Sequence, residues 1–230
     1  MEQLHNGYTL NLGPDSFPLS TDSVVLSSFV KLPKNASVLD LGSGCGTLGL
    51  LLCAADAGCQ VTGIELSEQD HLMALENSAQ NGLTSRLTSI CGDIRDIYRH
   101  FPTGSFSVCV SNPPYFSGGP ASKRVPDARR EDQCNLRQLF HAAGWVLKFG
   151  GDFFLVHRPE RLANMCAIAA DYQLEAKRLC LVRHSPEAPV NLVLLQFRKG
   201  ANPGLILEEL CLYDRDGQPT EAYKKIYHLD

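Results

Sequence analysis

The sequence has no apolar run approaching the roughly 20 residues that a membrane-spanning helix needs, so we expect no membrane span. Its first six residues show no progression from basic to apolar to small side chains, which predicts no secretory signal. It also has no Cys-x-x-Cys pair, although it contains nine cysteines. An odd number of cysteines, mostly inside apolar segments, predicts reduced thiols in a cytoplasmic protein, and neither disulfides nor a bound metal.

An excess of basic residues is also missing. The formal net charge is −4, so an RNA partner would require a local basic patch. What is present is the composition of an ordinary globular protein, with 44% hydrophobic and 20% charged residues. The length suits one large domain over residues 1–230, with residues 1–35 as an N-terminal cap and residues 201–230 as a C-terminal extension.

Short apolar segments alternate with helical patterns along most of the chain. This alternation predicts an α/β domain with a mostly parallel sheet and helices on both faces. Beyond residue 200 we expect a strand within 205–213, a turn at 216–217 and a short helix over 220–227. The strands of the main sheet are predicted at residues 37–42, 60–66, 87–91, 106–110, 152–157, 175–182 and 190–198.

The stretch Ser111-Asn112-Pro113-Pro114-Tyr115-Phe116 ends the fourth of these strands. Two prolines stop the strand and stiffen its end. The Asn112 side-chain oxygen and the Pro113 carbonyl can both accept hydrogen bonds from one planar NH2 group, and Tyr115 can lie against a ring. Two acceptors would bias an aromatic amine towards tetrahedral geometry and make it a better nucleophile. The alternative is a Pro-Pro turn with Tyr115 in the core.

Three further signals lie where the preceding strands end, which is where ligands bind in an open α/β sheet. A glycine-rich turn after the first strand lets the backbone approach a ligand, Glu65 can accept from both ribose hydroxyls, and Asp93 can accept from an adenine amine. Asp40 favours a positively charged group over a phosphate. Together they predict S-adenosylmethionine as the cofactor.

A dinucleotide is the rival cofactor, because Gly44-x-Gly46-x-x-Gly49 fits the G-x-G-x-x-G pattern and Glu65 follows at a suitable distance. Two features count against it. Gly42 already opens the turn, so the pattern would begin late, and Asp40 would repel a pyrophosphate.

With these motifs, residues 17–200 resemble the class I S-adenosylmethionine-dependent methyltransferases of the Asn/Asp-Pro-Pro-Tyr/Phe group. The resemblance implies a Rossmann-like, seven-stranded sheet with the last strand antiparallel, and S-adenosylhomocysteine as product. It implies a catalytic turn over Asn112, Pro113, Pro114 and Tyr115. The cofactor-binding residues that it implies are Thr21, Asp22, Asp40, Gly42, Gly44, Gly46, Glu65, Leu66, Asp93 and Asn112.

Within this group, the Thr-Asp helix start, Asn-Pro-Pro-Tyr-Phe and the Asp-Gly…Thr-Glu-x-Tyr tail look most like the bacterial tRNA(Val) adenine-N6 methyltransferases. This implies RNA methylation beside the anticodon. The expected RNA-binding residues are Tyr115, Phe116, Lys123, Arg124, Arg129 and Arg130. The alternative for residues 118–132 is a solvated loop, because Asp127, Glu131 and Asp132 partly cancel its charge.

Other functions remain open. A glutamine amide is also a planar NH2 group, so the turn suits a protein glutamine methyltransferase acting on a release factor. That family usually carries a helical N-terminal domain, whereas only a short segment precedes the first predicted strand. DNA adenine methyltransferases usually carry a separate target-recognition domain. A cofactor-binding fold without catalysis is the third possibility.

Overall fold

The computed structural model describes residues 2–4, 7–13, 19–114 and 136–229. A short hairpin of β1 (Glu2–Gln3) and β2 (Thr9–Leu10) precedes the main sheet. The main sheet consists of β3 (Ser37–Leu41), β4 (Gln60–Glu65), β5 (Leu87–Cys91), β6 (Phe106–Ser111), β7 (Leu147–His157), β8 (Leu174–Arg183), β9 (Val190–Lys199) and β10 (Ile206–Cys211).

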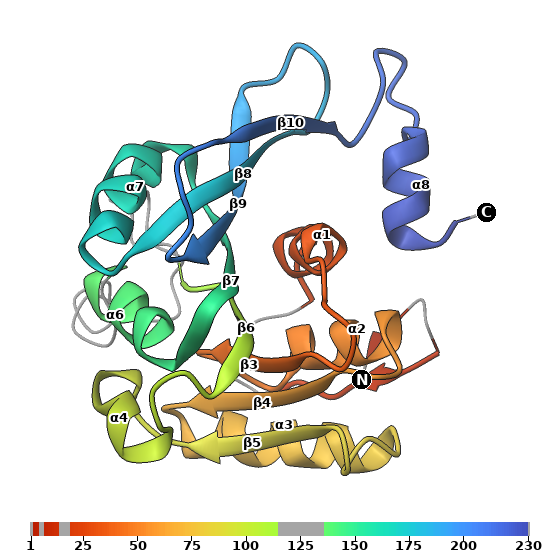
Figure 1. The fold of residues 1–230 in the computed structure, drawn as a ribbon. Helices are drawn as coiled ribbons and strands as arrows, with labels where there is room; N and C mark the ends of the chain where they lie inside the picture. The colour runs from red at the N-terminus through yellow and green to blue at the C-terminus, as the bar shows by residue number, and fades with distance from the viewer. Residues whose placement is uncertain (1, 5–6, 14–18, 115–135, 230) are drawn as a thin grey trace.

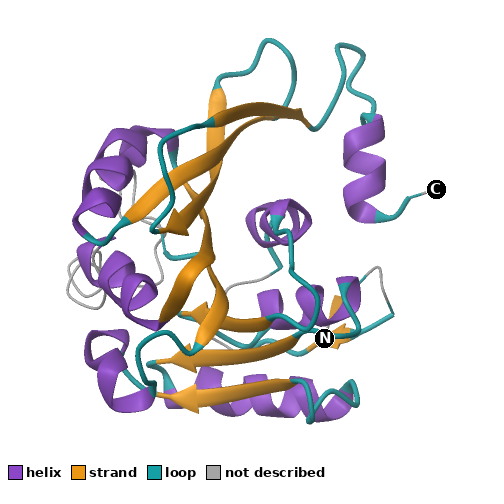
Figure 2. Cartoon of the chain, in the orientation of Figure 1, coloured by secondary structure: helices purple, strands orange, loops and turns teal. Residues whose placement is uncertain are grey.

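Helices and 3-10 turns connect these strands and cover both faces of the sheet (Figure 2). None of the helices in the described part of the chain has the length and apolar character needed to span a bilayer. The helical elements are α1 (Thr21–Phe29), α2 (Thr47–Ala55), α3 (Glu68–Gln80), η1 (Ile94–Asp96), α4 (Ile97–His100), α6 (Leu136–Val146), η2 (Pro159–Arg161), α7 (Leu162–Asp171) and α8 (Glu221–Tyr227).

The strand order is β10-β8-β9-β7-β6-β3-β4-β5 (Figure 1). Strands β3 to β7 pair in parallel, and β9 lies antiparallel between β7 and β8. The predicted parallel sheet with an antiparallel final strand is therefore confirmed. The tail adds β10 as an eighth strand, parallel to β8, and α8 follows it. Most predicted strand ends differ from the structure by at most one residue, but the start of β7 was wrong: it begins at Leu147 rather than at Asp152, because Leu147 pairs with Phe106.

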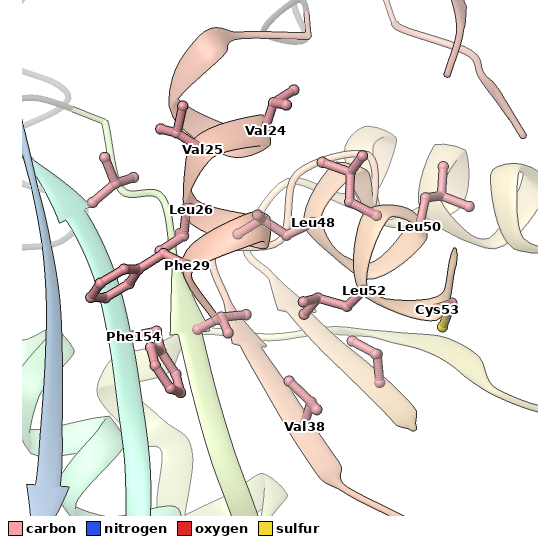
Figure 3. Close-up of a cluster of buried hydrophobic side chains, with 14 of the residues drawn as sticks. Val24, Val25, Leu26, Phe29, Val38, Leu48, Leu50, Leu52, Cys53 and Phe154 are labelled. Atoms are coloured by element: carbon pink, nitrogen blue, oxygen red, sulfur yellow. The ribbon is translucent and has the colours of Figure 1, made fainter. Parts of the chain in front are cut away.

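Two apolar clusters, one on each face, hold the sheet between its helices. Successive residues of β3 alternate between them, since Val38 belongs to one cluster and Leu39 to the other. Figure 3 shows the first cluster, in which side chains of α1 and α2 pack over Val38 and Phe154. The second cluster contains residues of α4, α6 and α7. Burial on both faces explains why the central strands are almost continuously apolar.

Replacing Phe140 with alanine should lower the free energy of unfolding by about 3–5 kcal/mol. Phe140 is fully buried and meets Phe153 and Phe197 edge-on, with ring centroids 5.4 and 5.1 Å away. Urea unfolding measures the change. Phe149→Ala is the matched control, because this ring is 76% exposed and its loss should cost about 1 kcal/mol or less. Equal losses from both substitutions would contradict this account of the core.

Candidate cofactor and amine site

Four neighbouring parallel strands end at one edge of the sheet, in the order β6, β3, β4, β5. Asn112 follows β6, Gly42 follows β3, Glu65 ends β4, and Asp93 follows β5 after one intervening glycine. The structure therefore brings these four predicted site residues to the same edge of the sheet. The ends are held by the hydrogen bonds Ser111 Oγ to Leu41 O (2.7 Å), Gly42 N to Ile64 O (3.0 Å) and Gly92 N to Glu65 O (2.8 Å).

The turn after β3 needs glycine at three positions. Gly42, Gly44 and Gly46 have φ angles of 73°, 52° and 87°, a region that other residues adopt only with strain. A β-carbon on Gly42 or Gly44 would face open space, with no described atom within 4 Å. The turn thus exposes backbone at the edge of the sheet, where a ligand can approach closely.

Glu65 joins the glycine turn to the start of α3. Its Oε2 accepts a hydrogen bond from Gly44 N at 2.8 Å, and its Oε1 accepts from Ser67 N at 2.9 Å. Each carboxylate oxygen has a second lone pair. Glu65 can therefore hold the turn and still accept from the two hydroxyls of a ribose. Leu66, the next predicted cofactor residue, is 45% exposed beside it.

Asp40 is a buried carboxyl group in β3, two residues before the glycine turn, with 2% of its surface exposed. Burial, and secondarily the charge of Glu65, raises its pKa to about 8. Neither Asp40 Oδ1 nor Ser43 Oγ has a hydrogen-bond partner among the described residues. Unsatisfied buried polar atoms are uncommon in folded proteins, so their presence here fits a site that a polar, positively charged ligand completes.

The Asp93 carboxylate is hydrogen-bonded to Arg95. Its oxygens accept from Arg95 N at 2.8 Å and Arg95 Nε at 2.7 Å. Partial burial opposes the shift, but these hydrogen bonds and the Arg95 charge lower the pKa of Asp93. The His100 ring packs so closely on Gly92 that a β-carbon there would lie 2.6 Å from Nε2. Neither Arg95 nor His100 was anticipated at this site.

The Asn112 amide is oriented by a helix from another part of the chain. Its Nδ2 donates to Ser23 Oγ in the first turn of α1, at 3.0 Å across 89 positions. Because Nδ2 faces Ser23, the acceptor Oδ1 lies at the other corner of the amide. Pro113 is buried and Pro114 is exposed. Ser20 caps α1 by accepting from Ser23 N.

This contact brings the start of α1, and with it Thr21 and Asp22, towards the end of β6. Sequence reasoning missed Ser23, and the nearest local signal was the Thr-Asp helix start at Thr21 and Asp22. The predicted RNA-binding residues lie outside the described residues; they are Tyr115, Phe116, Lys123, Arg124, Arg129 and Arg130.

Known proteins similar to this chain agree on one chemistry. The model of the methyltransferase small domain family matches residues 20–168. A tRNA1(Val) (adenine(37)-N6)-methyltransferase from Dickeya chrysanthemi (strain Ech1591) is 32% identical over 216 residues, which cover 90% of this chain and 85% of the relative. A protein of the same name from Actinobacillus pleuropneumoniae serotype 5b (strain L20) is 28% identical over 213 residues, covering 90% and 87%.

The fold agrees with this match. A predicted O-methyltransferase from Agrobacterium tumefaciens superposes with a TM-score of 0.76 at 19% identity, over 90% of this chain and 96% of that one. The glycine turn, Glu65 and the buried Asp40 fit S-adenosylmethionine, the methyl donor of such enzymes. The chain belongs to the methyltransferase small domain family, and within it to the tRNA1(Val) (adenine(37)-N6)-methyltransferases.

Proposed function

We propose that this protein transfers a methyl group from S-adenosylmethionine to the exocyclic N6 amine of adenine 37 in tRNA(Val). The observation that carries the proposal is the Asn112 amide, held by Ser23 at the strand end that adjoins the glycine turn. The names of the relatives support adenine 37 as the target. A tRNA substrate supports a cytoplasmic location, which forms part of this proposal.

The residues of the turn would activate the amine without a side-chain base. Asn112 Oδ1 and the Pro113 carbonyl accept the two N–H groups, so the nitrogen lone pair is directed at the methyl carbon. S-adenosylmethionine, when bound, would supply the methyl group: the amine nitrogen would replace sulfur on the methyl carbon, and the electron pair of the broken C–S bond would leave with S-adenosylhomocysteine. The methylated nitrogen then releases one proton to solvent.

The remaining roles follow the same assignment. Glu65 would bind the ribose hydroxyls, Asp93 the cofactor's adenine amine, and Asp40 with Thr21 and Asp22 its amino-acid end. Tyr115 and Phe116 would stack on the extruded base, at about 1–3 kcal/mol per base. Lys123, Arg124, Arg129 and Arg130 would contact RNA phosphates.

Labelled S-adenosylmethionine, incubated with the protein and bulk tRNA, tests the proposal. We expect the label in N6-methyladenosine after nuclease digestion. A release factor is the second substrate in the same assay, because a glutamine amide would fit the same turn. Label in the release factor and none in tRNA would overturn the proposal in favour of a protein glutamine methyltransferase.

Ser23→Ala should lower kcat about tenfold while cofactor affinity stays within about twofold, because the Asn112 amide loses the bond that fixes its orientation. Ser23→Thr, which keeps the hydroxyl, should restore much of the rate. The matched control is Ser28→Ala, since that exposed hydroxyl donates only to Val25 O within α1. Equal kcat values for Ser23→Ala and Ser28→Ala would contradict this role of Ser23.

A further inference from the structure

The segment Thr9–Asn11, here called the N-terminal strap, is bound along α3. Its central residue, Leu10, is fully buried in the first apolar cluster. The backbone groups of Asn11 and Thr9 bind Asn77 of α3 and Asn81, the residue that caps its C-terminus. Two exposed side-chain pairs add to this contact, Asn11 Nδ2 to Gln80 Oε1 and Gln80 Nε2 to Thr9 Oγ1. The strap lies before residue 20, where the match to the family model begins.

Two asparagines of the α3 region hold the strap in the same way. The Asn81 side chain accepts from Thr9 N and donates to Thr9 O, both at 2.8 Å. The Asn77 side chain accepts from Asn11 N at 2.8 Å and donates to Asn11 O at 2.9 Å. Four residues of helix rise about 6 Å, and two residues of strand span about 6.6 Å, so the two repeats match. Each amide therefore binds the strap as a neighbouring strand would.

Asn77 also contacts the glycine turn, and Asn81 does not. Its Nδ2 also donates to Cys45 O at 2.9 Å, and the side chain is fully buried. Cys45 lies between Gly44, whose N–H is held by Glu65, and Gly46. The turn is thus held by β4 on one side and by Asn77 on the other.

We propose that Asn77 is a positioning residue for the cofactor-binding turn, and that the N-terminal strap keeps it in place. This rests on the assignment of the glycine turn to S-adenosylmethionine. Glycine-rich backbone gains conformational freedom readily, so fixing the turn before the cofactor arrives lowers the entropy lost on binding. A buried Asn77 without the strap would leave Oδ1 unsatisfied, which makes strap docking and turn geometry interdependent.

The comparison of Asn77→Ala with Asn81→Ala separates this role from simple stabilisation. Both substitutions remove one two-bond contact to the strap, so both should lower the melting temperature. Only Asn77→Ala frees the Cys45 carbonyl. We expect it to weaken S-adenosylhomocysteine binding about tenfold by calorimetry, and to raise the cofactor KM with little change in kcat, whereas Asn81→Ala stays within about threefold. If Asn77→Ala does not fold, Asn77→Ser is compared with Asn81→Ser.

Hydrogen exchange gives a second readout, because coupling between strap and cofactor is reciprocal. S-adenosylhomocysteine should slow exchange of the Thr9 and Asn11 amides in the unsubstituted protein, and not in the Asn77 variant. Equal cofactor affinity in the Asn77 and Asn81 variants would overturn the role of Asn77 alone. A failure of the unsubstituted protein to bind S-adenosylhomocysteine would overturn the cofactor assignment with it, while a failure to methylate tRNA with binding intact would overturn only the proposed function.

Discussion

Asn112→Ala should lower kcat by about 10²–10³-fold, the range seen when one preorganised polar group facing the reacting atoms is removed. The reason is that one of the two acceptors for the target amine is lost, so its lone pair is no longer directed at the methyl group. Single-turnover methylation of tRNA with saturating cofactor measures the effect. Asn112→Asp, which keeps an acceptor oxygen, should retain more activity than the alanine variant.

The control for this prediction is cofactor binding. Asn112 lies at the edge of the proposed cofactor site, so Asn112→Ala should still bind S-adenosylhomocysteine with an affinity reduced only a few fold. A variant that turns over at the normal rate would remove Asn112 from the chemistry. Loss of cofactor binding equal to the loss of rate would instead make Asn112 a cofactor residue only.

Asp40→Asn should make the free protein more stable at pH 7 and weaken its binding of S-adenosylmethionine. In the folded protein the pKa of Asp40 is about 8, above the ordinary value of 3.8 that applies to the unfolded chain. Between these two values the folded protein holds a proton that the unfolded chain has lost, so the free energy of unfolding falls as the pH rises. The asparagine variant has no such slope, and its free energy of unfolding should be higher at pH 7, by up to about 4 kcal/mol.

Binding of the cofactor should lower the pKa of Asp40, whereas burial in the free protein raises it. A cationic ligand favours the ionised carboxylate, so affinity for S-adenosylmethionine should rise as the pH approaches 8 in the unsubstituted protein. Asp40→Asn should bind about tenfold more weakly at pH 8 and show a flat pH profile. Thermal unfolding and calorimetry from pH 6 to pH 8.5 measure both effects. A variant that is destabilised at pH 7, with normal cofactor affinity, would contradict the role given to Asp40.

The sequence predicted those features of the fold and the site that depend on residues close together in the chain. The glycine turn, Asp40 in the first main strand and the Pro113-Pro114 strand end each carry a local signal, and parallel topology follows from alternation alone. The contacts of Ser23 with Asn112 and of Asn77 with Asn11 join residues 89 and 66 positions apart, so no local pattern indicated them. The start of β7 was misplaced for the same reason, because its first pair is made with Phe106 of a different strand.

Removing the gene from its host and mapping modified nucleosides in tRNA(Val) by mass spectrometry tests the central claim most directly. We expect N6-methyladenosine at position 37 to disappear, to return when the unsubstituted gene is restored, and to stay absent when the restored copy carries Asn112→Ala. Unchanged N6-methyladenosine at position 37 in the deleted strain would contradict the claim.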